Sequence, residues 1–459
     1  MTSFVFYDFE TTGTSPAFDQ ALQFAAIKTD DQLNPIEKID IRCRLSDHIL
    51  PSPIALSVTG VTPDMLLNQN LSHYEFTLRL YNLIQRWSPA IWTGYNTISF
   101  DENVFRQMFY QNLFPELYRT QTNGNMRLDL LKAVYACWGY GRANPSIPEV
   151  DGKLTSKLDT LAPHNGFNEH NAHDALGDVR ATIFIAKLIR DREPEVWNVL
   201  MHNLNKVNVK AAFETGNILE IVERFGASPP KIYRGVFCGY NNGNQNQLGF
   251  FDLENANAED FVTPILDQVK AAVEKSPKQI RTIDLNKMPL VFGHQNPTQE
   301  MQYAAQQIVA NQTLRQLVGQ ALSERYDDQE EPELVEQQIY SGFYSNSDKA
   351  LLDQFHRAAW DQRMPIIDQL GDIRLKELGM RLMNLYAPQF VSEAHRHEFW
   401  ELIRQRWSGE RFYGDSERNP GNTYSSVTED MEQLKPDGKF EVSAEHLAAY
   451  AEFYEQRKV

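Results

Sequence analysis

The first residues able to do chemistry are two carboxylates, Asp8 and Glu10, at the end of a short apolar and aromatic run. The run Phe4–Tyr7 has the composition of a buried strand. Alternate residues of a strand point to the same face, so the two carboxylates are expected side by side. Burying them together is costly unless a cation lies between them, and a divalent metal ion is the usual one. The alternative is a strand that ends in solvent, and this stretch alone favours neither interpretation.

Two features add to this pair. The turn Thr11-Thr12-Gly13 follows Glu10 and supplies two hydroxyls and a flexible backbone that lets a ligand approach closely. A third carboxylate, Asp101, follows a second apolar segment and precedes a helical run. Taken alone, Asp101 is best interpreted as a helix N-cap. The junction of a strand end and a helix start is, however, also where α/β proteins collect functional residues.

The last cluster holds His173 and Asp178, next to an amphipathic helix that reaches about Arg190. His173 precedes Asp178 by five residues, so the two cannot share one face of a regular helix, and His173 is expected at the helix start above the same site. A single histidine in this place is more often a capping or surface residue. Three acidic elements and a histidine together favour a functional site.

The surrounding pattern predicts the elements that position these residues. Strands are expected at residues 23–28 and 39–44, forming an antiparallel meander with the first strand, and a further strand at residues 91–96. Ser72, with Glu75 three residues later, predicts a capped helix start. Strands followed by alternating helices and strands indicate a mixed sheet. Farther on, strands are expected at residues 231–238 and 249–253, a second strand pair at 281–285 and 290–292, and helices from about Ser347 to the end.

Length and composition limit the remaining choices. The chain has 459 residues, 42% of them hydrophobic, and a formal net charge of -17. It therefore holds several domains and does not coat duplex DNA through a positive surface. Cys43, Cys137 and Cys238 are few and widely spaced, which is typical of reduced core residues. With no signal peptide or membrane-spanning stretch visible, a cytoplasmic protein is expected.

The ordered motifs resemble those of the DEDD exonuclease superfamily, in its histidine-containing branch. They are Asp8-Phe9-Glu10-Thr11-Thr12-Gly13, then Gly94-Tyr95-Asn96 with Phe100-Asp101, then His173-Asp174-Ala175 with Asp178-Val179. Segments 286–289, 340–345, 372–375 and 386–388 extend the resemblance to the bacterial exodeoxyribonuclease I family over nearly the whole chain. The resemblance implies an α+β multidomain fold. Its parts would be a ribonuclease-H-like mixed-sheet exonuclease domain (1–190), a small Src-homology-3-like β domain (194–346) and an α-helical C-terminal domain (347–459).

It also implies a function, namely 3′-5′ hydrolysis of single-stranded DNA to nucleoside 5′-monophosphates in DNA repair and recombination. Two Mg²⁺ ions, with Mn²⁺ as a substitute, would assist the reaction. The implied metal ligands are Asp8, Glu10, Asp101 and Asp178, with His173 as general base. Single-stranded-DNA-binding protein is the implied partner, a monomer the implied state, and no membrane is involved.

The implied substrate contacts are Glu10, Thr11, Thr12, Arg106 and Lys157. Lys157 stands where the family has an arginine, which keeps the charge but loses the bidentate geometry. Arg106 can equally pair with a neighbouring acid. A proofreading subunit or a short-RNA exonuclease would share the three motifs but lack the other two thirds of the chain. A protein that only binds DNA would have lost a carboxylate or the histidine, and all are present. The choice between DNA and RNA stays open, because it depends on how the site treats the 2′ position.

Overall fold

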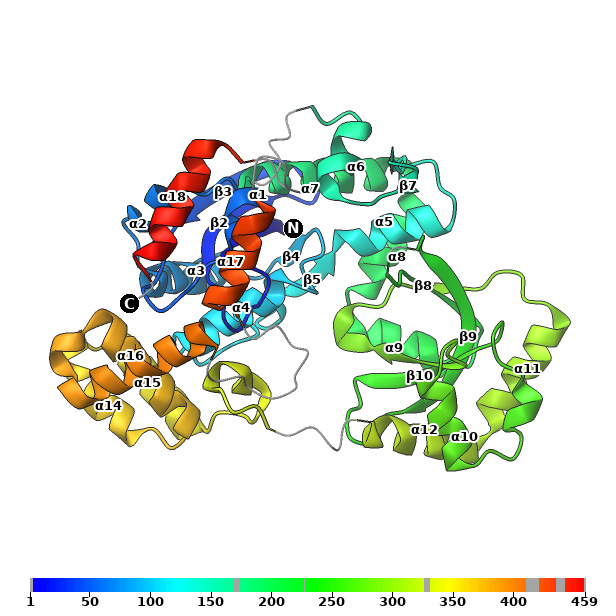
Figure 1. Cartoon of the computed structure of the whole chain (residues 1–459). Coiled ribbons are helices and arrows are strands. Elements are labelled where there is room, and N and C mark those ends of the chain that lie inside the picture. Colours follow the sequence, from blue (N-terminus) through cyan, green and yellow to red (C-terminus); the bar gives the residue numbers. More distant parts are fainter. Residues whose placement is uncertain are drawn as a thin grey trace.

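The computed structural model describes residues 3–168, 174–226, 228–325, 331–409, 421–434 and 442–457. It contains an N-terminal region built on a mixed sheet, a middle region built on an antiparallel sheet and a helical C-terminal region (Figure 1). Among these residues no helix is both long and apolar enough to cross a membrane. The three cysteines are buried and free, as predicted.

The N-terminal sheet has five strands in the order β3-β2-β1-β4-β5. They are β1 (Phe4–Thr11), β2 (Ala21–Thr29), β3 (Pro35–Arg42), β4 (Ile91–Gly94) and β5 (Met126–Asp129). The first three form the expected antiparallel meander, and β4 and β5 run parallel to β1. The predicted mixed sheet is therefore confirmed.

Helices cover both faces of this sheet. Helices α3 (His73–Trp87) and α4 (Asp101–Gln111) pack on one face, and α5 (Leu130–Gly139) and α7 (Ala175–Arg192) on the other. The region also contains α1 (Pro53–Val58), α2 (Pro63–Leu67), α6 (Leu158–His164), α8 (Pro194–Asn203) and a short hairpin of β6 (Glu149–Val150) and β7 (Lys153–Leu154). Tyr7 of β1 packs with α3 and α4, whereas its neighbour Phe6 packs with α5 and α7. Asp8 and Glu10 lie two and four residues after Phe6 and therefore on the same face of the strand, so both carboxylates point toward α7.

Two predicted helix features are confirmed. Ser72 caps α3 by accepting from the Glu75 backbone N–H, and the Glu75 carboxylate accepts from the Ser72 backbone N–H at 2.9 Å. The helix expected beyond Asp178 is α7, which holds Asp178 in its first turn.

The middle region has a second five-stranded sheet in the order β11-β10-β9-β8-β12, antiparallel throughout. Its strands are β8 (Leu219–Glu223), β9 (Lys231–Tyr240), β10 (Gln247–Asp252), β11 (Ile280–Asp284) and β12 (Val291–Gly293). One face packs on α10 (Leu266–Glu274), α11 (Gln299–Ala310) and α12 (Gln312–Glu324), and the other on α9 (Lys206–Glu214). The expectation that residues 281–285 and 290–292 pair with each other is wrong, because β11 and β12 lie at opposite edges. The Src-homology-3-like character of this region stays a prediction, as do the predicted domain boundaries.

The described C-terminal region is helical, as predicted. It holds α13 (Asn346–Arg357), α14 (Met364–Gln369), α15 (Ile373–Tyr386), α16 (Glu393–Ser408), α17 (Tyr424–Gln433) and α18 (Ala444–Glu455). The last two helices return to the N-terminal region, where they lie in orange and red beside α1 and α2 (Figure 1). The Tyr450 hydroxyl donates to the carbonyl of Val61 at 2.8 Å and the Tyr454 hydroxyl to that of Pro51 at 2.9 Å. The two ends of the sequence are thus joined in one packed unit.

Candidate active site

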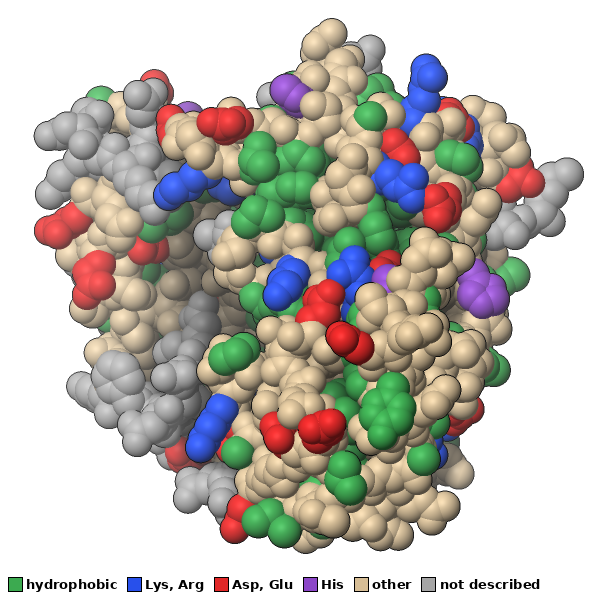
Figure 2. All heavy atoms as spheres, turned by 90° about the vertical axis from the view of Figure 1, so that its right-hand side faces the viewer, with side chains coloured by type: hydrophobic (Ala, Val, Ile, Leu, Met, Phe, Trp, Pro, Cys, Tyr) green, Lys and Arg blue, Asp and Glu red, His purple; other side chains and the backbone are tan. Residues whose placement is uncertain are grey.

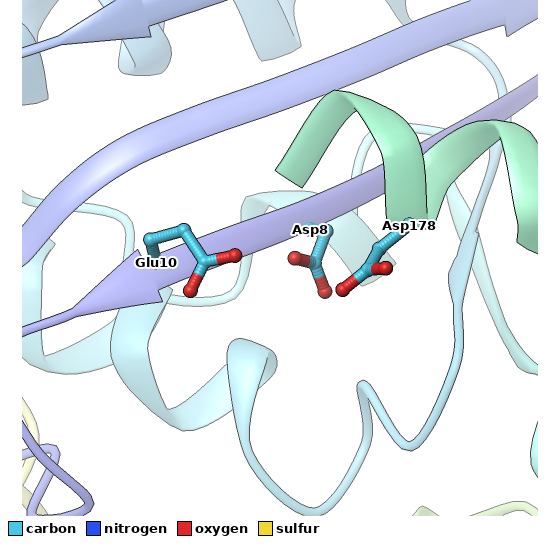
Figure 3. Close-up of side chains that lie close together, drawn as sticks. All are labelled: Asp8, Glu10 and Asp178. Atoms are coloured by element: carbon cyan, nitrogen blue, oxygen red, sulfur yellow. The ribbon is translucent and has the colours of Figure 1, made fainter. Parts of the chain in front are cut away.

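Three predicted ligands meet between β1 and α7. A carboxylate oxygen from each of Asp8, Glu10 and Asp178 lies within 4.8 Å of the others. Figure 3 shows Asp8 and Glu10 projecting from the strand and Asp178 from the first turn of the helix, with their oxygens directed into one shared space. Glu10 is buried and the other two are half-buried. The sequence separation of 170 residues is closed because α7 packs along the face of β1 that carries both carboxylates.

The electrostatics of this cluster are those of negative groups held close together in a poorly solvated place. Burial, followed by the charge of Asp101, raises the pKa of Asp8 well above its usual range. Burial, followed by the charge of Asp178, raises the pKa of Glu10 to about 8. A cation between the carboxylates would reverse both effects. The donor set consists of carboxylate oxygens alone, which fits a hard divalent ion such as Mg²⁺ or Mn²⁺.

Asp101 lies beside this cluster as the first residue of α4. Its Oδ1 accepts a hydrogen bond from the backbone N–H of Phe9 at 3.1 Å, which joins α4 to β1 between Asp8 and Glu10. Burial raises the pKa of Asp101 to about 8. The interpretation of Asp101 as an N-cap is wrong, since Phe100 occupies that position and makes no side-chain cap. Its carboxylate is not among the three that converge within 4.8 Å.

His173 lies outside the described residues. The adjoining Asp174 occupies the N-cap position of α7, and its backbone carbonyl accepts from the Asp178 N–H at 3.0 Å.

The two threonines of the first motif use their hydroxyls within their own turn. Thr11 Oγ1 donates to the Gly13 carbonyl at 2.6 Å. Thr12 Oγ1 donates to Asp19 Oδ1 at 2.9 Å and accepts from the Gln20 N–H at the same distance. Burial raises the pKa of Asp19 to about 6. These bonds give the turn after Glu10 a defined shape, so a contact of this turn with substrate would be made mainly by its backbone.

The two predicted basic contacts are differently placed. Arg106 lies one turn into α4, forms an ion pair with the buried Glu102 at 3.8 Å, and donates from Nη1 to the Tyr340 hydroxyl at 3.4 Å. Pairing with an acid is thus part of its role. Lys157 precedes α6 and is exposed, and no contact within the described part of the chain joins it to the acidic cluster.

Comparison with known proteins places this geometry in a family. The family model described as "Exonuclease" matches residues 5–186, which contain the whole acidic cluster. The model described as "Exonuclease I C-terminal domain" matches residues 333–456. Exodeoxyribonuclease I of Haemophilus influenzae is 28% identical over 436 residues, covering 87% of each chain. That of Escherichia coli is 27% identical over 446 residues, covering 90% of this chain and 91% of the other. The chain is thus a homologue of exodeoxyribonuclease I over most of its length.

Solved structures of this family share the fold along the whole chain. Escherichia coli Exonuclease I in complex with a dA16 oligonucleotide is 25% identical and covers 100% of both chains, with a TM-score of 0.85. A moderately thermophilic Exonuclease I from Methylocaldum szegediense gives the same TM-score and coverage at 24% identity, which supports the fold. The predictions of family and of an exonuclease enzyme are therefore confirmed.

Sequence reasoning missed several polar residues that border the site of this exodeoxyribonuclease I homologue. Asp174 accepts from Gln23 Nε2 at 3.3 Å and lies 3.6 Å from Arg42, and its charge raises the pKa of Asp8. Gln23 and Arg42 come from β2 and β3. How close Gln23 and Arg42 come to Asp174 depends on the register of the strands, which the sequence around each residue does not predict.

Proposed function

We propose that this protein is a 3′-5′ exodeoxyribonuclease that shortens single-stranded DNA and releases nucleoside 5′-monophosphates. The observation that supports this most is the convergence of Asp8, Glu10 and Asp178 within the exonuclease region. The structures of Escherichia coli Exonuclease I with dA16 and dT13 oligonucleotides support single-stranded DNA as the substrate.

The carboxylates would hold two divalent ions, Mg²⁺ in the proposal and Mn²⁺ as a substitute. Asp8, Glu10 and Asp178 would bind one ion, and Asp8 with Asp101 the second. Bound there, the ions would supply an activated water and neutralise charge on the leaving oxygen. The chain itself fixes the ligands: strand alternation aims Asp8 and Glu10, and the first turn of α7 aims Asp178.

His173 would take a proton from the attacking water as general base, since its unperturbed pKa of about 6.5 suits neutral solution. Replacing His173 with Ala is expected to slow hydrolysis by about 100-fold or more while leaving strand binding intact. Single-turnover hydrolysis and fluorescence anisotropy measure the two quantities separately. Near-normal turnover of the variant would refute the role.

Selectivity for single strands agrees with the charge of the protein. The net charge is -17, and acidic and basic side chains are interspersed over the face of the middle region shown in Figure 2. Such a surface gains little from the counterion release that drives binding to long duplexes. We propose that the strand instead follows a local path past Arg106, where Tyr340 is 62% and Phe343 101% exposed. Exposed aromatic rings beside a cation are the usual platform for stacked bases.

Further parts of the proposal rest on the family. They are a role in DNA repair and recombination, binding of single-stranded-DNA-binding protein, a monomeric state, a cytoplasmic location, and a Src-homology-3-like middle domain. The substrate contacts Glu10, Thr11, Thr12, Arg106 and Lys157 belong to the same proposal.

The test is digestion of matched single-stranded DNA and RNA labelled at the 5′ end, with Mg²⁺ or with chelator, beside the Asp178→Ala variant. A 3′-shortening ladder on DNA alone, lost with chelator and in the variant, is expected. Equal loss of RNA would keep the site but refute the substrate. No metal-dependent cleavage of either strand would refute the enzyme and favour a DNA-binding protein.

A further inference from the structure

An arginine stands in line with the acidic cluster across three strands. In the register of the sheet Glu10 of β1 lies opposite Gln23 of β2, and Gln23 lies opposite Arg42, the last residue of β3. Residues directly opposite in antiparallel strands project from the same face. Arg42 therefore belongs to the face of the sheet that carries the metal-ligand candidates.

Gln23 connects this row to the start of α7. It is fully buried, and its Nε2 donates to Asp40 Oδ1 at 2.8 Å and to Asp174 Oδ1 at 3.3 Å. Its Oε1 is also buried and has no partner in the part of the chain that the structure describes. The Gln23 amide nitrogen thus links Asp40 of β3 to Asp174 at the start of α7, on the same face of the sheet as Arg42.

Arg42 itself is only loosely engaged. Its Nη2 lies 3.6 Å from Asp174 Oδ1, and the two side chains are 30% and 35% exposed. A pair of this length and exposure contributes little free energy. A guanidinium has five N–H donors, so most of its hydrogen-bonding capacity remains for a ligand. The positive charge of Arg42 acts on the cluster. Burial and the neighbouring carboxylates raise the pKa of Glu10, and Arg42 opposes them by lowering it.

We propose that Arg42 is a substrate-contacting residue that binds a phosphate of the DNA strand beside the acidic cluster, an inference that rests on the proposed exonuclease function. The incoming strand is a polyanion and must approach Asp8, Glu10, Asp101 and Asp178. A guanidinium next to them offsets repulsion and presents paired N–H groups that match phosphate oxygens.

The salt dependence of binding tests this contact directly. Each phosphate contact on a single strand contributes about 0.7 to the slope of log affinity against log salt concentration. Binding of a 5′-fluorescent oligothymidylate is measured by anisotropy at several salt concentrations, with chelator present to prevent hydrolysis. Arg42→Gln is expected to weaken binding by about tenfold, the size of one charge-assisted hydrogen bond, and to reduce the slope by about 0.7. Arg42→Lys is expected to keep the slope and lose part of the affinity.

Two controls separate a phosphate contact from other roles. Arg86→Gln removes an arginine that is 62% exposed and pairs with Glu37 near the other end of β3, and it is expected to leave the slope unchanged. Introducing Arg42→Gln into the Asp174→Asn variant tests whether Arg42 acts only through its contact with Asp174. The proposal predicts that the Arg42→Gln effect persists there. Its disappearance, or an unchanged slope in folded Arg42→Gln, would overturn the inference. A wild-type protein that neither binds nor shortens the strand would instead overturn the proposed function.

Discussion

At the scale of single residues, Asp101 combines a structural bond with a proposed role in metal binding. It is 4% exposed, accepts from the Phe9 N–H, and adds negative charge beside Asp8. Asp101→Asn keeps an acceptor oxygen but removes a carboxylate whose burial is costly without a cation. The metal-free variant is therefore expected to melt at a higher temperature than wild type, while its Mg²⁺-dependent hydrolysis falls roughly 100-fold. Calorimetry in chelator and a single-turnover assay measure both, and wild-type hydrolysis would contradict the role.

Phe343 allows a second test, because its ring is fully exposed in the part of the chain that the structure describes. It is 101% exposed, between the 3-10 helix η4 (Val335–Tyr340) and α13. Stacking of one base on an aromatic ring contributes about 1–3 kcal/mol. Phe343→Ala is expected to weaken oligonucleotide binding by about 5- to 150-fold with an unchanged melting temperature, whereas Phe343→Trp retains binding. Equal affinities of wild type and the alanine variant by anisotropy would place the strand elsewhere.

The residues that sequence predicted are those whose geometry is local. Asp8 and Glu10 share a face because strands repeat every two residues, and Asp178 lies in the first turn of a recognisable helix. The bond of Asp101 to β1 and the position of Arg42 depend on packing and register. No pattern within a short window encodes them.

At the scale of elements, the same limit appears in the middle sheet. Residues 281–285 and 290–292 are strands as predicted, because their composition and flanking turns are local signals. They pair with β10 and β8 and not with each other, because pairing depends on how the whole sheet packs against its helices. Closeness in sequence was therefore a poor guide to strand pairing.

One contact between elements has a measurable pH dependence. His356 of α13 lies between Tyr74 of α3 and Leu113 after α4, and its ring stacks on Phe114 with centroids 4.0 Å apart. The Leu113 carbonyl, 3.0 Å from Nε2, can only accept, so Nε2 carries the proton and Nδ1 accepts from the Tyr74 hydroxyl at 2.8 Å. Burial lowers the pKa of His356 to about 4.

The sign of the effect follows from proton uptake. Below about pH 6.5 His356 is protonated in the unfolded chain, whereas in the folded protein it stays neutral down to about pH 4. The contribution of His356 to the free energy of unfolding is therefore fully present above about pH 6.5. It falls as the pH drops to about 4, by about 3 kcal/mol at that lower limit. His356→Gln can make the same bonds without titrating. The difference in unfolding free energy between wild type and variant is expected to change across this window, and a constant difference would contradict the assignment.

At the scale of the whole molecule, a buried ion network fastens the helical region to the exonuclease region. Arg381 of α15 and Arg406 of α16 both donate to Oε1 of Glu336, Arg406 at 3.1 Å. Arg406 also donates to the carbonyl of His48 at 2.8 Å, and Gln107 of α4 donates to the backbone carbonyl of Glu336 at 3.0 Å. Burial alone would raise the pKa of Glu336, but the two arginines more than offset it and the pKa is lowered. The Glu336 carboxylate thus joins α15 to α16, while its backbone carbonyl and Arg406 make the contacts with the N-terminal region.

Removing the Glu336 carboxylate leaves two buried guanidinium groups without the buried negative charge that they share. Glu336→Ala is expected to destabilise the protein by about 3–5 kcal/mol. The matched control is Glu377→Ala, because Glu377 also pairs with Arg381 but is 48% exposed, and its loss is expected to cost no more than about 1 kcal/mol.

Since regions of a multidomain chain can unfold separately, thermal melting is combined with limited proteolysis. Glu336→Ala is expected to lower the first transition and expose the helical region to cleavage, whereas equal behaviour of the two variants would show that the Glu336 carboxylate does not hold the regions together. Gln107, through which the network contacts α4, lies six residues after Asp101 and keeps its bond to the Glu336 backbone in the variant, so residual hydrolysis below the first transition is expected to stay close to wild type.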